Sequence, residues 1–350
     1  MENINKDSVK PKRRIRYKGK HPRRFEEKYK ELDFEKYSSD VEKIIQSGKT
    51  LAGTHRPICV SEILDILKPL PGQIGLDATL GFGGHAVELL KKIQPHGRLF
   101  ALDVDPLELA RTEKRLRKMG FSEEELIVKR SNFAGIHKLL VEASGSFDFI
   151  LADLGLSSMQ LDNPARGFTF KYEGPLDLRL NPESGQSASE LIRVLDKKQL
   201  GKIFLENSDE PYARQIASAV FKNKNKINTT KDLANVIVDA LSKKSSLDYE
   251  IEIKNSIRRV FQALRIEVND EFSVLEQFLR NLPFCLKPKG RVAILSFHSG
   301  EDNRVMNFFE QGLREGLYSD ISREPTRPSA KERYSNPRSK SAVLRWAIKQ

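Results

Sequence analysis

The chain has 350 residues, of which 39% are hydrophobic and 31% charged, so it can bury a substantial core and hold a smaller second domain. No apolar run approaches the roughly 20 residues of a membrane span, and the amino-terminal residues lack the apolar region of a secretory signal. We therefore expect a cytoplasmic protein with no membrane partner. Cys59 and Cys285 lie far apart in apolar contexts, and the six histidines have no ligand spacing, so neither a disulfide nor a metal site is predicted.

The net charge of +12 is concentrated at the two ends of the chain. Residues 1–24 carry ten Lys or Arg and two acidic residues, and residues 321–350 carry eight and two, which leaves about −2 for the rest. Aromatic Tyr17, Phe25 and Tyr29 are interleaved with the first cluster. This pattern favours a basic extension over residues 1–50 that binds nucleic acid; a solvated tail is the alternative.

Four predicted strands alternate with helices over the first half of the chain. Short apolar runs bounded by turn residues lie at 74–80, 98–105, 125–129 and 147–153. Helical spacing of apolar residues lies between them at 86–93, 107–116 and 134–141, with Asp105 as the N-cap of the second helix. The alternation predicts an α/β protein with a doubly wound parallel sheet.

A helical region then interrupts the predicted sheet. Apolar residues recur at helical spacing over 187–195, 197–206, 212–221 and 230–241. One long helix, roughly 255–280, is expected to return the chain to the sheet. The remaining predicted elements are a buried strand at 290–296, a helix at 301–313 and a closing edge strand at 341–348.

Two strand ends carry the residue types that binding sites need. Ligands of open parallel sheets bind beyond the carboxyl ends of the strands, where Asp153 and the polar loop after it are expected to face a pocket. The glycine turn at 81–84 precedes a helix whose free N–H groups suit an anionic group. Asp103 follows Gly81 by 22 residues, a spacing that suits a carboxylate binding ribose hydroxyls. An adenosine-containing cofactor is therefore predicted.

With these motifs in place, the chain resembles the bacterial 16S ribosomal RNA cytosine-N4 methyltransferase family over about 300 residues. The matching motifs include Asp77-Ala-Thr-Leu-Gly-Phe-Gly-Gly-His85, Asp153-Leu-Gly-Leu-Ser-Ser-Met-Gln-Leu-Asp162, Gly174-Pro-Leu-Asp-Leu-Arg179, Ser296-Phe-His-Ser299 and Asn336-Pro-Arg338. The resemblance implies a Rossmann-like class I fold that uses S-adenosylmethionine to methylate N4 of a cytosine in the decoding centre, the P site, of 16S rRNA. It places a methyltransferase domain at 51–183 and 252–350, and an inserted helical RNA-recognition domain at 184–251.

The resemblance also implies the roles of individual residues. The expected cofactor contacts are Gly83, Gly84, His85, Asp103, Phe133, Asp153 and Gln160. From the residue types of the loop, Arg166 and Arg179 are expected to hold RNA phosphates, and Phe168 either stacks on the target base or pins the loop to the sheet. Arg265 is a further expected RNA contact. The substrate is expected to be 16S rRNA within the small subunit or a late assembly intermediate, and the sequence does not decide whether the chain is a homodimer.

The expected chemistry rests on positioning. A sulfonium methyl is already electrophilic, whereas N4 of cytosine is a poor nucleophile whose N–H must be held by an acceptor. Asp153, or a backbone carbonyl of its loop, is the first candidate for that acceptor, and His298 is a second that is equally well explained as a structural histidine. A nicotinamide dehydrogenase would share the glycine turn and Asp103, and a non-catalytic RNA-binding assembly protein would explain the charge. A cytosine-C5 methyltransferase would need a cysteine at a strand end, which this sequence lacks.

Overall fold

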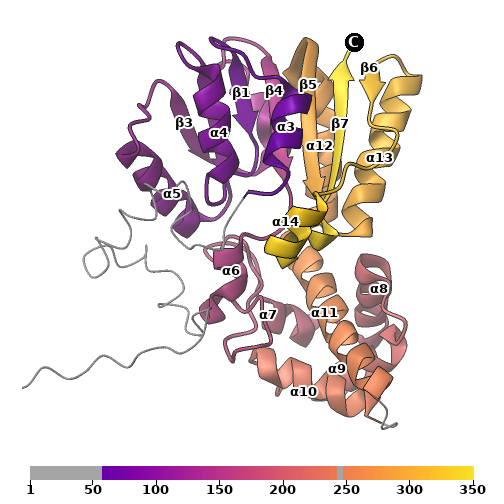
Figure 1. Ribbon diagram of the computed structural model, residues 1–350. Coiled ribbons are helices and arrows are strands. Elements are labelled where there is room, and N and C mark those ends of the chain that lie inside the picture. The colour runs from indigo at the N-terminus through magenta and orange to yellow at the C-terminus, as the bar shows by residue number, and fades with distance from the viewer. Residues whose placement is uncertain (1–56, 243–246) are drawn as a thin grey trace, which may run out of the picture. The chain divides into compact units, whose positions relative to one another are not determined.

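The computed structural model describes residues 57–242 and 247–350, so the predicted basic extension at 1–50 lies outside the described residues. Its centre is a seven-stranded sheet with the strand order β3-β2-β1-β4-β5-β7-β6 (Figure 1). The strands are β1 (Ile74–Asp77), β2 (Arg98–Asp103), β3 (Leu126–Arg130), β4 (Phe147–Asp153), β5 (Leu286–Ser296), β6 (Tyr318–Ile321) and β7 (Val343–Lys349). β1 to β5 pair in parallel, while β7 pairs antiparallel with both β5 and β6. The predicted Rossmann-like α/β class is confirmed.

Helices cover both faces of the sheet because its strands are apolar on both sides. On one face, α3 (Val60–Leu67), α4 (Gly84–Ile93) and α5 (Pro106–Lys118) share a core with strand residues such as Leu99 and Leu151. On the other face lie the 3₁₀ helix η2 (Phe133–Leu139), α12 (Glu271–Cys285) and α13 (Ser299–Arg314), which pack on residues such as Phe100 and Ile150. Figure 1 shows α3 and α4 on the opposite side of the sheet from α12.

A separate helical core follows β4. Its helices are α7 (Ala188–Val194), α8 (Lys197–Ser208), α9 (Ala213–Asn223), α10 (Thr230–Leu241) and α11 (Leu247–Asn269). Their buried apolar residues form one cluster that also takes in Phe168, Leu176 and Leu178 from the preceding loop. The helical core therefore begins before residue 184, and the predicted boundary at 251 falls inside α11. Two short helices, α6 (Ser158–Asp162) and η3 (Pro164–Arg166), connect β4 to this loop.

Three predicted elements differ in the structure. The single helix expected at 255–280 is two helices, because Asp270 adopts a left-handed conformation (φ 50°) between α11 and α12. The strand at 341–348 is not the edge of the sheet, because the four-residue β6 pairs with its outer side. The helix expected at 134–141 is a 3₁₀ helix with a kink at Gly135. In the part of the chain that the structure describes, no helix is both long enough and apolar enough to cross a membrane.

The carboxyl ends of the parallel strands meet at one edge of the sheet, here called the carboxyl edge. β1, β2 and β4 each end on an aspartate there: Asp77, Asp103 and Asp153. A short segment between β6 and β7, which contains α14 (Ala330–Ser335) and η4 (Pro337–Ser341), also lies at this edge, because it leads into the Val343 that pairs with Ser296, the last residue of β5.

Candidate active site

The glycine turn after β1 is fixed by the carboxylate of Asp103. Oδ2 of Asp103 accepts a hydrogen bond from the Gly81 N–H at 2.8 Å, and Oδ1 accepts one from the Asp105 N–H at 2.9 Å. The Thr112 hydroxyl donates to the Gly81 carbonyl at 2.6 Å. Gly83 is the N-cap of α4 with φ 73°, and a Cβ there would lie 3.0 Å from the Thr112 methyl. Only glycine therefore fits this turn without displacing α5.

The three strand-end aspartates share an electrostatic environment that favours a positive ligand. Burial raises the pKa of Asp77 and of Asp103 to about 6. Burial, with a smaller contribution from the charge of Glu301, raises the pKa of Asp153 to about 7. Desolvated carboxylates are stabilised by a nearby cation. S-adenosylmethionine carries a sulfonium and an ammonium group, so the residues at this edge fit the cofactor that the sequence implies.

His85 is paired with Asp153 in a defined tautomer. His85 Nε2 lies 3.0 Å from the carbonyl oxygen of Ile58, which can only accept, so Nε2 carries the proton. Burial lowers the pKa of His85, which leaves Nδ1 unprotonated in the neutral ring. That nitrogen lies 3.5 Å from Oδ2 of Asp153. The contact between His85 Nδ1 and Asp153 Oδ2 is favourable when one proton lies between these two atoms.

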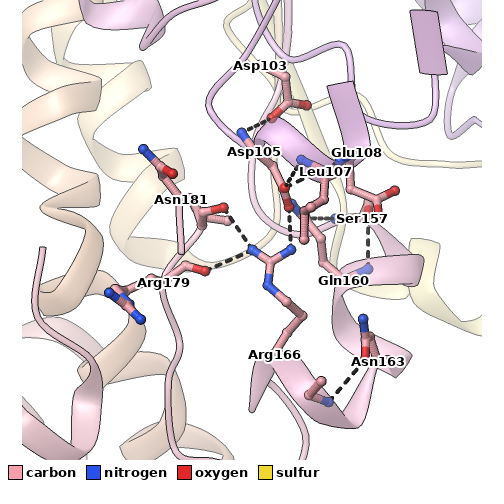
Figure 2. Close-up of polar contacts among 12 residues, drawn as sticks. Asp103, Asp105, Leu107, Glu108, Ser157, Gln160, Asn163, Arg166, Arg179 and Asn181 are labelled. Atoms are coloured by element: carbon pink, nitrogen blue, oxygen red, sulfur yellow. Dashed lines mark hydrogen bonds and ion pairs between the residues drawn. The ribbon is translucent and has the colours of Figure 1, made fainter. Parts of the chain in front are cut away.

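Asp105 connects the loop after β4 to the end of β2 (Figure 2). Its fully buried carboxylate caps α5, as predicted, by accepting from the N–H groups of Leu107 and Glu108. It also accepts from Nε2 of Gln160 at 2.8 Å and from the Arg166 guanidinium at 2.5 Å. Because the Asp105 N–H is itself bonded to Asp103, which also accepts from Gly81, the loop and the glycine turn form one connected network.

The four residues predicted to contact RNA have partners within the protein. Arg166 is buried, and its remaining donors bond the carbonyls of residues 179 and 180, as Figure 2 shows. Arg179 forms two hydrogen bonds with Asp177, and Arg265 forms two with Glu271. The side chain of Phe168 lies in the helical core. The guanidinium groups are paired with carboxylates or bonded to backbone carbonyls, which stabilises the folded protein, and the RNA contacts of these residues stay predictions.

Three other predicted site residues take up defined positions. Phe133 begins η2 after β3 and packs edge-on against Phe278 of α12 at a centroid distance of 5.1 Å. The Gln160 side chain caps α6 by accepting from the Ser157 N–H, in addition to its bond with Asp105. His298 is the N-cap of α13, and its Nε2 lies 3.3 Å from Glu301. The cofactor contact of Gln160 and the catalytic role of His298 stay predictions.

Sequence reasoning assigned no role to two buried acids at this edge. Asp77 carries the same signal as Asp103 and Asp153, since it ends a buried strand, and is 1% exposed. Glu301 accepts a hydrogen bond from the Phe297 N–H at 2.8 Å and lies close enough to Asp153 to raise its pKa. Glu301 is three residues after His298 at the start of a helix, which sequence alone reads as a cap.

The family model and the relatives in sequence agree on the family of this chain. The description of the matching family model is the MraW methylase family, and the match covers residues 52–350. Ribosomal RNA small subunit methyltransferase H 1 of Lachnoclostridium phytofermentans is 52% identical, over 97% of this chain and 93% of that protein. Ribosomal RNA small subunit methyltransferase H 2 of Alkaliphilus metalliredigens is also 52% identical, over 97% and 98%. Among solved structures, an rRNA methylase from Streptococcus thermophilus gives a TM-score of 0.39 at 12% identity, covering 84% of this chain and 97% of that one.

Proposed function

Because this chain belongs to the MraW methylase family and its methyl donor is S-adenosylmethionine, we propose that it methylates N4 of a cytosine in the decoding centre, the P site, of 16S rRNA. Two relatives that match 97% of this chain are named ribosomal RNA small subunit methyltransferases, which supports 16S rRNA as the substrate. The observation that carries the chemistry is Asp153 at the end of β4, with 28% of its side chain open beside the buried His85. Family membership removes the nicotinamide dehydrogenase from consideration.

The cofactor side of the site is formed by β1, β2 and the glycine turn. The bound cofactor supplies a methyl group that is already activated by its sulfonium. Asp103 ends β2 next to the glycine turn, where its carboxylate, held by the N–H groups of Gly81 and Asp105, is positioned to accept hydrogen bonds from the ribose hydroxyls. The cofactor is expected to lie against Gly83, Gly84 and His85 at the start of α4, where His85 faces Asp153, with Phe133 as an apolar wall for the adenine.

Asp153 performs the orienting step on the substrate side. Its open carboxylate accepts one N–H of the cytosine amine, which turns the nitrogen lone pair toward the methyl group. When the methyl–nitrogen bond forms and the methyl–sulfur bond breaks, the amine becomes positively charged and must lose one proton. Ionised Asp153 takes that proton, and the Nδ1 atom of His85 shares it at 3.5 Å.

The target base must leave its stack to reach the carboxyl edge, since Asp153 lies at a strand end behind the loop that carries α6. The energy of extrusion has to come from contacts with the surrounding RNA. The substrate is therefore the folded small-subunit RNA, within the subunit or a late assembly intermediate, and not free cytidine. A non-catalytic assembly protein would bind the same RNA without leaving a methyl group on it.

The test in cells is a map of methylated cytosines. Ribosomal RNA from cells with and without the gene is digested and its nucleosides are located by mass spectrometry. The proposal expects one N4-methylcytosine in the decoding centre that disappears with the gene and returns with the wild-type copy. It is refuted if the decoding-centre cytosines carry the same modifications in both strains.

A further inference from the structure

The segment between β6 and β7, residues 322–342, carries a row of exposed cations at the carboxyl edge. We call it the α14 segment. Its exposed basic residues are Arg323, Arg327, Lys331, Arg333 and Lys340. None of the five has an ion-pair partner among the described residues, and Glu324 is the only exposed acidic residue that the described segment contains. Unlike the arginines of the substrate loop, these side chains are free to meet an anion.

Two contacts join the α14 segment to the active site. Glu332 accepts a hydrogen bond from the Cys59 N–H at 3.2 Å and lies near enough to His85 to influence its pKa. Arg338 pairs with Asp162, the last residue of α6, at 2.7 Å. Figure 1 shows α14 close to α6 at the carboxyl end of the strands. The cations are thus held on a structured support beside the site.

The segment also exposes an aromatic ring. Tyr334 is 91% exposed and stands between Arg333 and the turn at Asn336. Exposing such a ring gains nothing in the folded chain, whereas an aromatic face stacks on an unpaired base. Alternating cations and an exposed aromatic side chain are the combination that binds single-stranded or looped RNA.

We infer that the α14 segment is the surface that holds the phosphates flanking the target cytosine, with Tyr334 stacking on a neighbouring base. This inference rests on the proposed function and adds the surface that binds the RNA backbone. Residues 323–340 thus take the phosphate-binding role that the sequence analysis predicts for Arg166, Arg179 and Arg265. The cations of the α14 segment bind the phosphates of the RNA backbone, while Asp153 accepts the proton of the extruded cytosine.

The test compares two triple variants of the full-length protein. R327Q/K331Q/R333Q removes three cations of the segment, and K92Q/K114Q/R280Q removes three exposed cations from α4, α5 and α12. All six side chains are exposed, so both proteins should fold and bind S-adenosylmethionine like the wild type. Affinity for a small-subunit RNA fragment is measured from 50 to 300 mM salt.

The segment variant should bind RNA more weakly, and its slope of log K against log salt should be shallower by roughly 2 to 3, since each lost phosphate contact removes about 0.7 to 0.9. The control variant should keep the wild-type slope. Y334A should weaken binding roughly fivefold or more without changing the slope, because stacking releases no counterions. At saturating RNA, the segment variant should keep its methyl-transfer rate and show only a raised KM.

The outcomes separate this inference from the proposed function. Equal slopes for the wild type and the segment variant, with N4-methylcytosine still formed, would overturn the surface and leave the function standing. An equal loss in both triple variants would mean that general positive charge binds the RNA, and would also overturn it. If the wild type methylates no cytosine of the fragment or of the intact subunit, the proposed function fails and this inference fails with it.

Discussion

The Nδ1 atom of His85 lies 3.5 Å from Oδ2 of Asp153, while the opposite ring nitrogen donates to the carbonyl of Ile58. This arrangement leaves the facing ring nitrogen as an acceptor, so the pair is stable with one shared proton and repulsive without it. Asp77 from β1, Glu301 from α13 and Cys59 ahead of α3 are the other titratable groups that act on Asp153 or respond to its charge. Burial, with a smaller contribution from the charge of Glu301, favours protonation of the aspartate.

Methyl transfer should therefore depend on pH near neutrality. Burial and the charge of Glu301 raise the pKa of Asp153 to about 7, and only the ionised carboxylate can take the proton of the amine. The single-turnover rate should rise about tenfold per pH unit below the pKa and level off above it. A bound cation lowers the pKa of a nearby carboxylate, so the midpoint should lie at about 7 or below. Cofactor affinity measured over the same pH range separates binding from chemistry, and a flat rate between pH 5 and 8.5 would contradict this role.

Removing the Asp103 carboxylate should weaken cofactor binding. D103A deletes the proposed acceptor of the ribose hydroxyls together with the acceptor of the Gly81 and Asp105 N–H groups, which should cost roughly 1.5 to 3 kcal/mol of binding free energy. Titration calorimetry with S-adenosylmethionine measures the loss. D320A, which removes an exposed carboxylate on the edge strand β6, is the control and should bind normally. Unchanged affinity in D103A would show that the ribose is bound elsewhere.

The ion pair between Arg166 and Asp105 should contribute to stability far more than an exposed pair in the same region. Both partners are buried, with 7% and 0% of their side chains exposed, so R166M leaves an uncompensated charge. The free energy of unfolding should fall by about 3 to 5 kcal/mol. R130Q removes the exposed pair with Glu183 and should cost less than about 1 kcal/mol. Denaturant titrations that give equal losses for the two variants would contradict the structural role of Arg166.

A conservative substitution distinguishes the two roles of His298. Asparagine is a good N-cap, so H298N keeps the cap of α13 while removing the titratable ring. If His298 only caps the helix, thermal stability and the methyl-transfer rate should both stay near the wild type, which is the result we expect from its position beside Glu301. A hundredfold slower rate at normal stability would instead make His298 a second proton acceptor.

The strands and the site aspartates could be predicted from sequence because their signals are local. A buried parallel strand is a short apolar run, and the aspartate at its end marks the carboxyl edge, as at Asp103 and Asp153. The N-cap at Asp105 was equally local and is confirmed. The predictions that were wrong concern features whose partners lie far away in the sequence. The break at Asp270 accompanies Asn269, whose side chain bonds the backbone at Leu178 and Leu180, 91 and 89 residues away.

The arginines illustrate the same limit. An arginine in a predicted binding loop is naturally interpreted as a phosphate contact. Nothing in the neighbouring sequence indicates that Arg166 pairs with Asp105, 61 residues earlier. The pairing of Arg179 with Asp177 is local, yet sequence cannot show that the bidentate geometry is formed. β6 was missed because four residues, two of them exposed, carry little periodicity.

The most direct test of the account is the product formed by purified protein in a single turnover. Wild-type enzyme and D153N are mixed with S-adenosylmethionine and small subunits that lack the modification, and the nucleosides are identified by mass spectrometry. The account predicts N4-methylcytosine from the wild type, and a rate about 10² to 10⁴ lower for D153N with nearly unchanged cofactor and RNA affinity. Methylation at C5, or a D153N variant with the wild-type rate, would contradict it.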